Sequence, residues 1–447
     1  MKYKSLKDTD DEIFRLLKEE EKRQNSDIPL IPSENFASDA VLKAIGSVFT
    51  NKYAEGYSGK RYYKGAVNID KVESLAIERA KQVFGAYSAN VQPYSGSPAN
   101  AAVYFALAKP FADTILGLEL SSGGHLTHGS KVSFSGKLFN SVMFTVKKNG
   151  EIDYDEVESL ALKHKPKIIW AGTTAYTKLI DYERFRKIAD KVGEDTYLVA
   201  DISHISGLVA SNVIPSPVNF VDIITTTTHK DMRGPRGAMI MVTPRGIQKN
   251  PSLDKMIDDT VFPFLQGGPH INTIAGIAVA LKESESLEFK EYSKQILLNC
   301  KALCTSLINR GFELVGGVSE THLTLINLTK DNINGWEFAY ALEKAGIIVN
   351  ASTIPHDENS PFFPSGIRIG TPAATTLCLK EKDMDTIAEF IYQVKLELDT
   401  FKFKELSSQK LRKDPNIRKG FINELINSKR IKEIKLETEN FMKVYSK

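Results

Sequence analysis

Residues 222–237 read Asp222-Ile-Ile-Thr-Thr-Thr-Thr-His229-Lys230-Asp-Met-Arg233-Gly234-Pro-Arg236-Gly237. A short apolar strand runs into four threonines, so we expect Lys230 where a buried strand opens into a polar loop. A lysine that forms a Schiff base needs apolar, water-free surroundings that lower its pKa, and hydroxyl or amide donors beside it that hold a phosphate. The same window also fits a surface lysine after an edge strand, and it leaves both interpretations open.

A second strand of this kind precedes it. Residues 196–207 read Thr196-Tyr-Leu-Val-Ala-Asp201-Ile-Ser-His204-Ile-Ser-Gly207. Ligands of open α/β sheets gather at the carboxyl ends of strands, so we expect Asp201 and Lys230 to converge on one crevice. A carboxylate there suits the ring nitrogen of pyridoxal phosphate, whose protonated pyridine is an electron sink. His204 would hydrogen-bond the ring hydroxyl or orient its neighbours, although Asp201 alone also fits a loop cap.

The order of helical and strand patterns predicts the fold class. From about residue 70 to 285, helical patterns alternate with short strands, which indicates an α/β fold with a mixed, mostly parallel sheet flanked by helices. A long helix from Ser286 would lead to a smaller α+β domain with strands near 322–327 and 347–350. We therefore expect an N-terminal helix and arm over 1–40, a large cofactor-binding domain over 41–285, and a small C-terminal domain with a basic helical tail over 286–447.

Composition narrows the functional classes. The 447 residues are 42% hydrophobic and 25% charged, as in an ordinary globular protein, and no stretch approaches the roughly 20 apolar residues of a membrane span. The N-terminus lacks the apolar region of a signal peptide and is too acidic for a transit peptide, so we expect a cytoplasmic protein. The spacing of the three cysteines fits neither a metal site nor disulfides, and we expect no metal.

Charge is concentrated at the C-terminal end. Residues 401–447 carry 13 Lys and Arg against 6 Asp and Glu, while the whole chain has a net charge of only +3. Such a tail attracts phosphates, acidic partners or RNA, or it is a solvated helical face. Because no pattern of stacking aromatic residues accompanies the tail, we expect no nucleic-acid partner. At the other end, residues 8–24 have the pattern of an exposed amphipathic helix that would wrap a partner subunit.

Further stretches from about residue 30 to residue 395 carry a family resemblance. They are Ile31-Pro-Ser33-Glu34-Asn35-Phe36, Asn51-Lys-Tyr53-Ala-Glu55-Gly-Tyr57, Lys60-Arg61-Tyr62-Tyr63, Gln92-Pro-Tyr-Ser95-Gly96-Ser97-Pro-Ala-Asn100, Gly123-Gly124-His125-Leu126-Thr127-His128-Gly129, Gln266-Gly267-Gly268-Pro269 and Ser365-Gly366-Ile-Arg368-Ile-Gly370-Thr371-Pro372-Ala373. Together with the two strands, they resemble the serine hydroxymethyltransferases, a fold-type I pyridoxal phosphate family. The stretches stand in family order, and the resemblance covers most of the chain.

The resemblance implies an activity and its partners. It implies interconversion of L-serine plus tetrahydrofolate with glycine plus methylenetetrahydrofolate, with pyridoxal 5'-phosphate bound covalently at Lys230 and tetrahydrofolate as co-substrate. It also implies an obligate homodimer and leaves a tetramer open. Two alternatives are a folate-independent aldolase that cleaves threonine-like β-hydroxy amino acids, and a non-catalytic, RNA-binding or regulatory relative that uses the basic tail.

Cofactor-binding residues follow from the same resemblance. Gly96 and Ser97 stand before a helical run whose first amides can cradle a phosphate, although a plain helix cap fits them too. The other residues that the resemblance places at the cofactor are His125, which stacks on the ring, Thr227 and His229 beside Lys230, and Tyr53, Gly267 and Gly268, which reach the phosphate from the partner subunit. Two successive glycines equally permit an ordinary turn.

Substrate-binding residues complete the prediction. Arg368 offers the bidentate guanidinium that a carboxylate needs, although a structural salt bridge is a rival interpretation for Arg368 and for Arg236. Glu55 lies among tyrosines, which should raise its pKa and let it carry a proton. The resemblance makes Tyr63 a further catalytic residue and adds Ser33 and Thr174 for the amino acid and Leu120, Gly124, Leu126 and Ser352 for the folate. Ser352 replaces an asparagine that is usual in the family, and it is the one residue that favours the aldolase.

Overall fold

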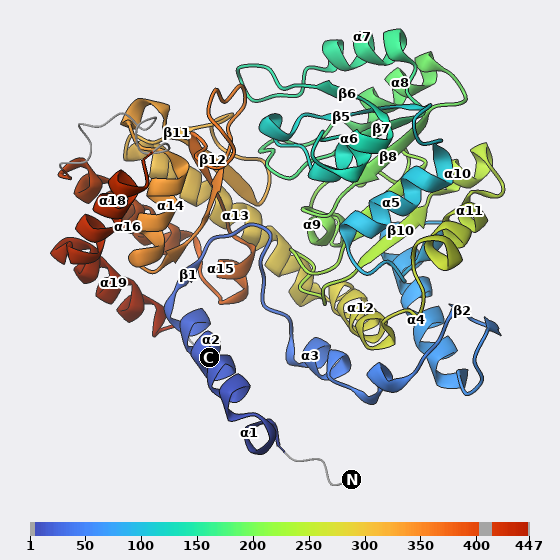
Figure 1. Cartoon of the computed structure of the whole chain (residues 1–447), viewed down its shortest axis with the longest axis horizontal. Coiled ribbons are helices and arrows are strands. Elements are labelled where there is room, and N and C mark those ends of the chain that lie inside the picture. The colour runs from blue at the N-terminus through green and yellow to red at the C-terminus, as the bar shows by residue number, and fades with distance from the viewer. Residues whose placement is uncertain (1–4, 402–413, 446–447) are drawn as a thin grey trace.

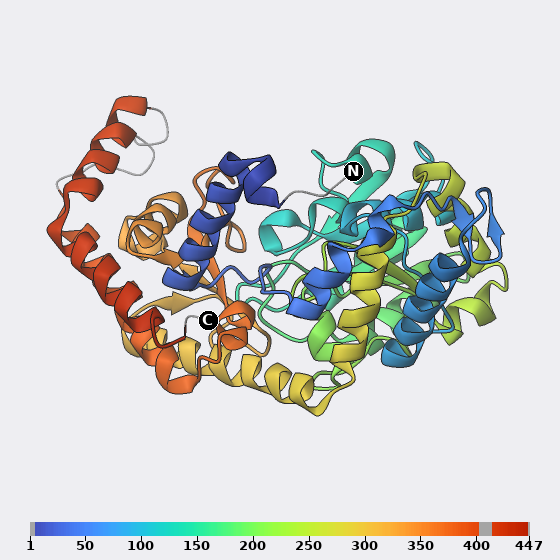
Figure 2. The same cartoon turned by 90° about the horizontal axis from the view of Figure 1, so that it is seen from below.

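The computed structural model describes residues 5–401 and 414–445 and has two lobes (Figure 1). The larger lobe contains a seven-stranded sheet and the smaller lobe a four-stranded sheet. Helix α13 (Leu287–Asn309) runs from one lobe to the other, as Figure 2 shows. This is the long linking helix that the sequence predicts from Ser286 onward.

The large sheet has the strand order β4-β10-β9-β8-β7-β5-β6. All neighbouring strands are parallel except β10, which is antiparallel to both of its neighbours. The predicted mixed, mostly parallel α/β sheet is therefore confirmed. Its strands are β4 (Ser88–Asn90), β5 (Thr114–Leu118), β6 (Asn140–Phe144), β7 (Ile168–Gly172), β8 (Tyr197–Asp201), β9 (Ile223–Thr227) and β10 (Ala238–Val242).

Helices cover both faces of this sheet, so every residue of its central strands β7, β8 and β9 is buried. Along β7, Ile169 and Ala171 join one core cluster, while Ile168 and Trp170 join the other. The first cluster includes α4 (Val67–Phe84), α7 (Tyr154–His164), α8 (Tyr182–Val192), α9 (Ser206–Ala210) and α12 (Ile271–Ser284). The second includes α5 (Gly96–Leu107), α6 (Phe134–Leu138), α10 (Pro244–Lys249) and α11 (Leu253–Asp259).

The small lobe packs helices against an antiparallel sheet of order β11-β12-β15-β14. Cys300 and Cys304 of α13 are fully buried in its core, where they pack as small apolar groups. The elements are β11 (Glu313–Leu314), β12 (Leu323–Asn327), β14 (Asn350–Ser352), β15 (Gly366–Gly370), α14 (Gly335–Lys344), α15 (Pro372–Thr376), α16 (Glu381–Asp399), α18 (Pro415–Asn427) and α19 (Lys429–Met442). The last two helices form the described part of the basic tail, and residues 402–413 lie outside the described residues.

The N-terminal arm belongs structurally to the small lobe. After α1 (Leu6–Thr9) and α2 (Asp11–Ser26), strand β1 (Ile28–Pro29) pairs in parallel with β13 (Ile347–Ile348). Ile28 and Leu30 are buried in the core of that lobe. Figure 1 shows α1 and α2 extending away from both lobes, and Leu16 of α2 is 54% exposed.

The segment after the arm crosses to the large lobe as α3 (Asp39–Ile45) and the hairpin of β2 (Gly56–Tyr57) and β3 (Lys60–Arg61). The remaining short helical segments are η1 (Val48–Asn51), η2 (Leu120–Ser122), η3 (Leu126–His128), η4 (Thr260–Leu265) and η5 (Thr329–Asp331). Among the described residues, no helix combines the length and the apolar character that crossing a bilayer requires.

Candidate active site

A cavity of about 200 Å³ lies where β8 and β9 end. Asp201 is the last residue of β8 and pairs with Thr225 of the parallel β9, and Lys230 follows β9 by three residues. The two strand ends thus converge as the sequence predicts. The cavity is lined by Ser95, Gly96, Ser97, His125, Thr173, Thr174, Asp201, Ser203, His204, Thr227, His229 and Lys230.

Lys230 has the environment of a nucleophilic amine. Its Nζ donates to Thr227 Oγ1 at 2.8 Å. Burial lowers the pKa of Lys230 to about 8, although the nearby charge of Asp201 acts in the opposite direction. The backbone is also fixed, because Asn35 Nδ2 donates to the Lys230 carbonyl at 2.9 Å. A lysine with such a pKa is partly neutral near physiological pH and is able to attack a carbonyl.

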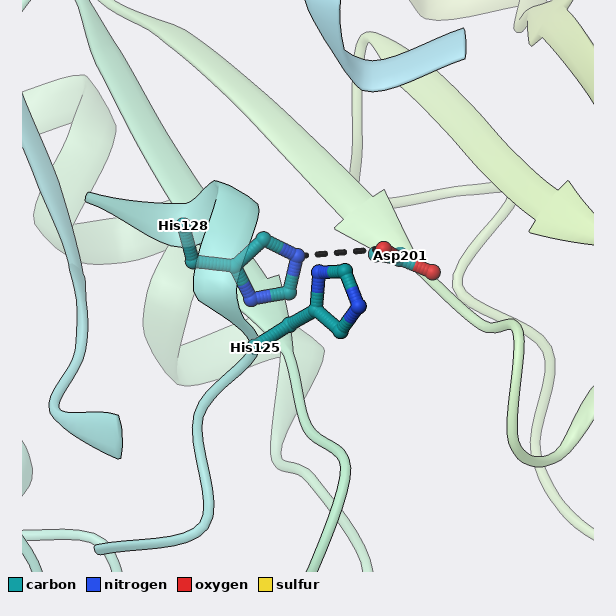
Figure 3. A group of neighbouring side chains, drawn as sticks. All are labelled: His125, His128 and Asp201. Atoms are coloured by element: carbon teal, nitrogen blue, oxygen red, sulfur yellow. Dashed lines mark hydrogen bonds and ion pairs between the residues drawn. The ribbon is translucent and has the colours of Figure 1, made fainter. Parts of the chain in front are cut away.

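Asp201 is held as a carboxylate at the floor of the cavity. Asn100 Nδ2 donates to its Oδ2 at 2.9 Å, and the Ser203 amide donates to its Oδ1 at 3.0 Å. The ring of His128 lies 3.1 Å from Oδ2 through Nε2, as Figure 3 shows. Burial is the largest single effect and would raise the pKa of Asp201, but the hydrogen bonds and charge interactions with His128, His125 and Ser203 together outweigh burial, and the pKa lies well below its usual range.

His125 completes a three-residue group with His128 and Asp201 (Figure 3). The potential ligand atoms of the group lie within 4.8 Å of one another, which is a spacing that a metal ion would accept. However, Asp201 Oδ2 is already used by His128 and Asn100. His125 Nδ1 accepts from the Thr127 amide at 3.2 Å, and burial lowers the pKa of His125 to about 4, so the ring is neutral. The absence of a metal stays a prediction.

The N-terminus of α5 faces the same cavity, which Ser95, Gly96 and Ser97 line. Its N-cap residue Ser95 makes no side-chain capping hydrogen bond, so the first amides of the helix are not satisfied by a cap. A Cβ on Gly96 would lie 2.8 Å from Thr227 Cγ2, which explains the glycine. Uncapped amides suit a phosphate, and the cavity therefore fits a phosphate-bearing ring that an amine binds at one end and a carboxylate at the other.

Arg368 is a buried guanidinium, and residues 5–401 and 414–445 supply no counter-ion for it. It lies on β15, is 8% exposed, and donates through Nε to Asn350 Oδ1 at 3.1 Å and through Nη1 to the Thr174 carbonyl at 2.8 Å. No carboxylate of the described residues lies within ion-pair distance of Arg368, so the rival interpretation as a structural salt bridge is wrong for this residue. Burial lowers the pKa of Arg368 to about 10, and an anionic ligand would relieve that cost.

Arg236 differs from Arg368 because it is exposed, and its Nη1 lies 3.4 Å from His229 Nε2. A buried salt bridge is therefore wrong for Arg236 as well. Ser33 lies outside the Lys230 cavity. It lines a neighbouring cavity of about 360 Å³, which shares His229 with the first.

A second group of predicted residues gathers away from this cavity. Tyr53 Oη donates to Glu55 Oε1 at 3.2 Å, and the rings of Tyr53 and Tyr63 meet edge to face with centroids 5.0 Å apart. A Cβ on Gly267 would lie 3.2 Å from Glu55 Oε1, and one on Gly268 would lie 3.2 Å from the Tyr53 ring. We call these five residues the Tyr53 cluster. None of them lines the Lys230 cavity.

The predicted folate residues lie on two segments beside the cavity. Leu120, Gly124 and Leu126 flank His125, and a Cβ on Gly124 would meet the Leu118 carbonyl at 1.9 Å, so only glycine fits there. Ser352 ends β14, opposite Gly366 of the strand that carries Arg368. Its hydroxyl donates to the Thr353 carbonyl at 3.2 Å. None of the four residues lines the Lys230 cavity.

The sequence predicts no role for four residues of the site. Asn100 and His128 hydrogen-bond to Asp201, Asn350 accepts from Arg368, and His322 lies beside His204. The sequence contains a signal for two of these residues. Asn100 is a polar residue in an otherwise apolar helical run, and His128 is the second histidine of a glycine-rich loop. No local pattern distinguishes His322, whose contact with His204 joins residues 118 positions apart.

Comparisons with known proteins agree with this geometry. A family model described as serine hydroxymethyltransferase matches residues 6–391. The serine hydroxymethyltransferase of Desulfotalea psychrophila (strain LSv54 / DSM 12343) is 52% identical over 390 residues, which are 87% of this chain and 89% of the relative. That of Halorhodospira halophila (strain DSM 244 / SL1) is 51% identical over 385 residues, 86% of this chain and 91% of the relative. That of Legionella pneumophila (strain Corby) is 50% identical over 391 residues, 87% of this chain and 92% of the relative.

Proposed function

The chain belongs to the serine hydroxymethyltransferase family, and we propose that it interconverts L-serine plus tetrahydrofolate with glycine plus 5,10-methylenetetrahydrofolate. The observation that carries the proposal is one cavity in which an amine of lowered pKa and a buried carboxylate lie together, next to a buried guanidinium that donates to the cavity residue Thr174 and has no ion-pair partner among the described residues. Lys230, Asp201 and Arg368 supply these groups. A non-catalytic relative would have no use for such a costly set of buried charges.

Pyridoxal 5'-phosphate fits the donor set of the cavity. Lys230 would hold it covalently through Nζ, the N-terminus of α5 at Gly96 and Ser97 would hold the phosphate, and Asp201 would hold the ring nitrogen. When bound, this cofactor supplies an electron sink for bonds that break at the amino acid Cα. His125, Thr227, His229 and His204 are the remaining residues that we propose for the cofactor.

Asp201 and its neighbours fix the charge at the floor of the site. Because Asn100, His128 and the Ser203 amide all bond to the carboxylate, Asp201 stays ionised and is not free to turn away. An ionised carboxylate in this position keeps a bound proton on a ring nitrogen. The cluster of Figure 3 therefore serves the cofactor in this proposal, and His128 orients Asp201.

Arg368 would bind the carboxylate of serine or glycine. Its Nη1 and Nε are already anchored to Thr174 and Asn350, and Nη2 has no partner among the described residues. The guanidinium is thus oriented before substrate arrives, which reduces the entropy that binding costs. Ser33 is the residue of the same chain that we propose beside it, and Tyr63 would reach it across the subunit interface.

Glu55 would carry the proton of the hydroxymethyl transfer, and Leu120, Gly124, Leu126 and Ser352 would bind the folate. We propose that the Tyr53 cluster acts in the cavity of a partner subunit, because all five residues lie outside the Lys230 cavity of their own chain. The active unit is then a homodimer, with a tetramer left open. The cytoplasmic location stays a prediction from the sequence.

One experiment tests this function. Serine cleavage is measured with purified protein saturated with pyridoxal phosphate, with and without tetrahydrofolate, next to threonine and allo-threonine. Serine turnover that depends strongly on tetrahydrofolate is expected. Cleavage of threonine-like substrates at a higher rate than serine, unaffected by folate, would instead select the aldolase.

A further inference from the structure

Two buried histidines meet where the two lobes touch. His204 follows β8 in the large lobe and lines the Lys230 cavity, whereas His322 precedes β12 in the small lobe. His204 Nδ1 lies 3.4 Å from His322 Nε2, and the rings stack with centroids 5.5 Å apart and planes 28° apart. Only 6% of His204 and 1% of His322 is exposed. The proposed function assigns no role to His322.

Both rings are neutral. Burial and the positive charges of Lys230 and Arg368 lower the pKa of His204 well below its usual range, and burial and the same two cations lower the pKa of His322 to about 3. In a neutral imidazole, one nitrogen donates and the other accepts. Only one proton therefore lies between the two rings, and either ring could supply it.

The second nitrogen of His322 decides between the two arrangements. His322 Nδ1 is buried and has no hydrogen-bond partner in the described part of the chain. If His204 donated to His322, then His322 would carry its own proton on Nδ1 as a buried, unpaired N–H, which native structures avoid more strictly than an unpaired acceptor. If His322 donates through Nε2, only a lone pair is left unpaired. His204 then carries its proton on Nε2.

We propose that His322 is a positioning residue of the site: it donates from Nε2 to His204 Nδ1 and thereby makes His204 present Nε2–H to the Lys230 cavity. His204 Nε2 has no partner among the described residues, so this donor is available to a ligand. The inference rests on the proposed function only for the identity of that ligand. The tautomer follows from the protein alone.

The position of His322 is itself tied to the substrate-binding strand. Thr371, which follows β15, donates its amide to the His322 carbonyl at 3.0 Å. Leu323 and Gly370 pair in the adjoining register, two residues from Arg368 on β15. The contact with His204 therefore depends on the same strand pair that places Arg368. A change in lobe position would move both groups together.

The tautomer is measured directly in the apoprotein. Protein labelled with ¹⁵N only in its eight histidines is prepared without pyridoxal phosphate, and long-range ¹H–¹⁵N correlations assign the protonated nitrogen of each ring. Variants in which one histidine at a time is replaced assign each signal to its residue. We expect His204 and His322 both as neutral Nε2–H tautomers at pH 7. An Nδ1–H or a doubly protonated His204 would overturn the inference, whatever the enzyme catalyses.

Matched variants test the consequence. His322→Gln keeps an N–H near the position of Nε2, whereas His322→Leu removes it. In His322→Leu we expect the His204 signals to average between tautomers and kcat for serine to fall about tenfold, with a KM change below about twofold. His322→Gln should keep kcat within about threefold of wild type. Ser293→Ala is the control and should match wild type, because Ser293 of α13 is also buried and its hydroxyl has no hydrogen-bond partner among the described residues.

Three outcomes would overturn the inference: an unaltered His204 tautomer and kcat in His322→Leu, equal losses in His322→Gln and His322→Leu, or a KM that rises in parallel with the loss of kcat. The last would indicate a role only in lobe packing. If wild-type protein fails to turn over serine but shows the expected tautomers, the proposed function fails and the assignment of His322 stands. If His322→Leu does not fold, the wild-type spectrum and His322→Gln still decide.

Discussion

The Lys230 cavity and the Tyr53 cluster differ in how completely one chain builds them. In the cavity, Asp201 is 8% exposed and every oxygen of its carboxylate has a protein partner. In the cluster, Tyr53 is 55% exposed, and its hydroxyl donates to Glu55 within the cluster. The first region is assembled within a single chain. The second presents polar and aromatic groups outward, as a region that acts on a neighbouring molecule would.

The difference in burial between the cavity and the cluster suits two different functions. Binding a cofactor needs fixed charges and hydrogen-bond donors, and these come from the two strand ends and from the N-terminus of α5, which lines the cavity. Transfer of a carbon unit to a second substrate needs groups that approach from the solvent-exposed side of the cavity. If this division is right, variants in the cavity should affect all reactions of the enzyme, and variants in the cluster should affect only some.

Lys230→Ala should have the largest effect. Without its amine the cavity has no covalent anchor, so the absorbance of covalently bound pyridoxal phosphate should disappear and serine turnover should fall by about 10⁴-fold or more. The absorption spectrum and single-turnover rates measure both quantities. An unchanged spectrum would move the covalent site to another lysine.

Arg368→Lys should have the second-largest effect. An ammonium cannot reproduce the two parallel hydrogen bonds that a guanidinium gives a carboxylate, and we expect serine and glycine binding to weaken by roughly 2–4 kcal/mol. Isothermal titration with glycine measures the loss. Arg310→Lys is the control, since Arg310 forms ion pairs with Asp385 and Glu389 at the surface of the small lobe. A normal affinity in Arg368→Lys would show that another cation holds the carboxylate.

Glu55→Gln should distinguish the two regions. The amide keeps the size and the hydrogen bond but cannot titrate, so serine turnover with tetrahydrofolate should fall by about 10², while cleavage of allo-threonine without folate falls much less. Parallel assays of both substrates give the ratio. Equal losses would make Glu55 a structural residue and would remove the division between cavity and cluster.

The smallest expected effect is a pH dependence of cofactor uptake. Only the unprotonated amine of Lys230 reacts with an aldehyde, and burial lowers its pKa to about 8. The rate at which apoprotein takes up pyridoxal phosphate should therefore rise as pH increases through about 8 and then level off. Stopped-flow absorbance between pH 6.5 and 9.5 measures the profile. A rate that still climbs steeply at pH 9.5 would mean that the amine has an ordinary lysine pKa.

The sequence predicts the cavity well because local sequence patterns mark the residues that form the cavity. Asp201 ends an apolar run, Lys230 follows a short apolar strand and four threonines, and strand ends of a parallel sheet share one edge. The bounds of β12, Leu323–Asn327, agree with the strand predicted near 322–327 because its apolar residues form one short, compact run. The resemblance adds Arg368, whose surroundings no local pattern describes.

Other parts of the molecule depend on contacts between distant segments. His128 bonds to Asp201, 73 residues away, and its neighbours in the loop give no reason to prefer it to His125. The pairing of β1 with β13 joins residues about 320 positions apart, so the arm attaches to the small lobe for reasons that its own sequence does not contain. In the proposed function, the Tyr53 cluster acts in a second chain, and burial within one chain gives only the outward position of the cluster.

Subunit mixing tests the division between the two regions most directly. Glu55→Gln protomers retain Lys230, and Lys230→Ala protomers retain Glu55, so a mixed dimer has one site with both residues if the Tyr53 cluster serves its partner. Each parent should be nearly inactive in the folate-coupled reaction, and random mixing should restore about a quarter of the wild-type activity, because half the dimers are mixed and half their sites are intact. Mixed dimers that are shown to form and yet recover no activity would contradict a shared site.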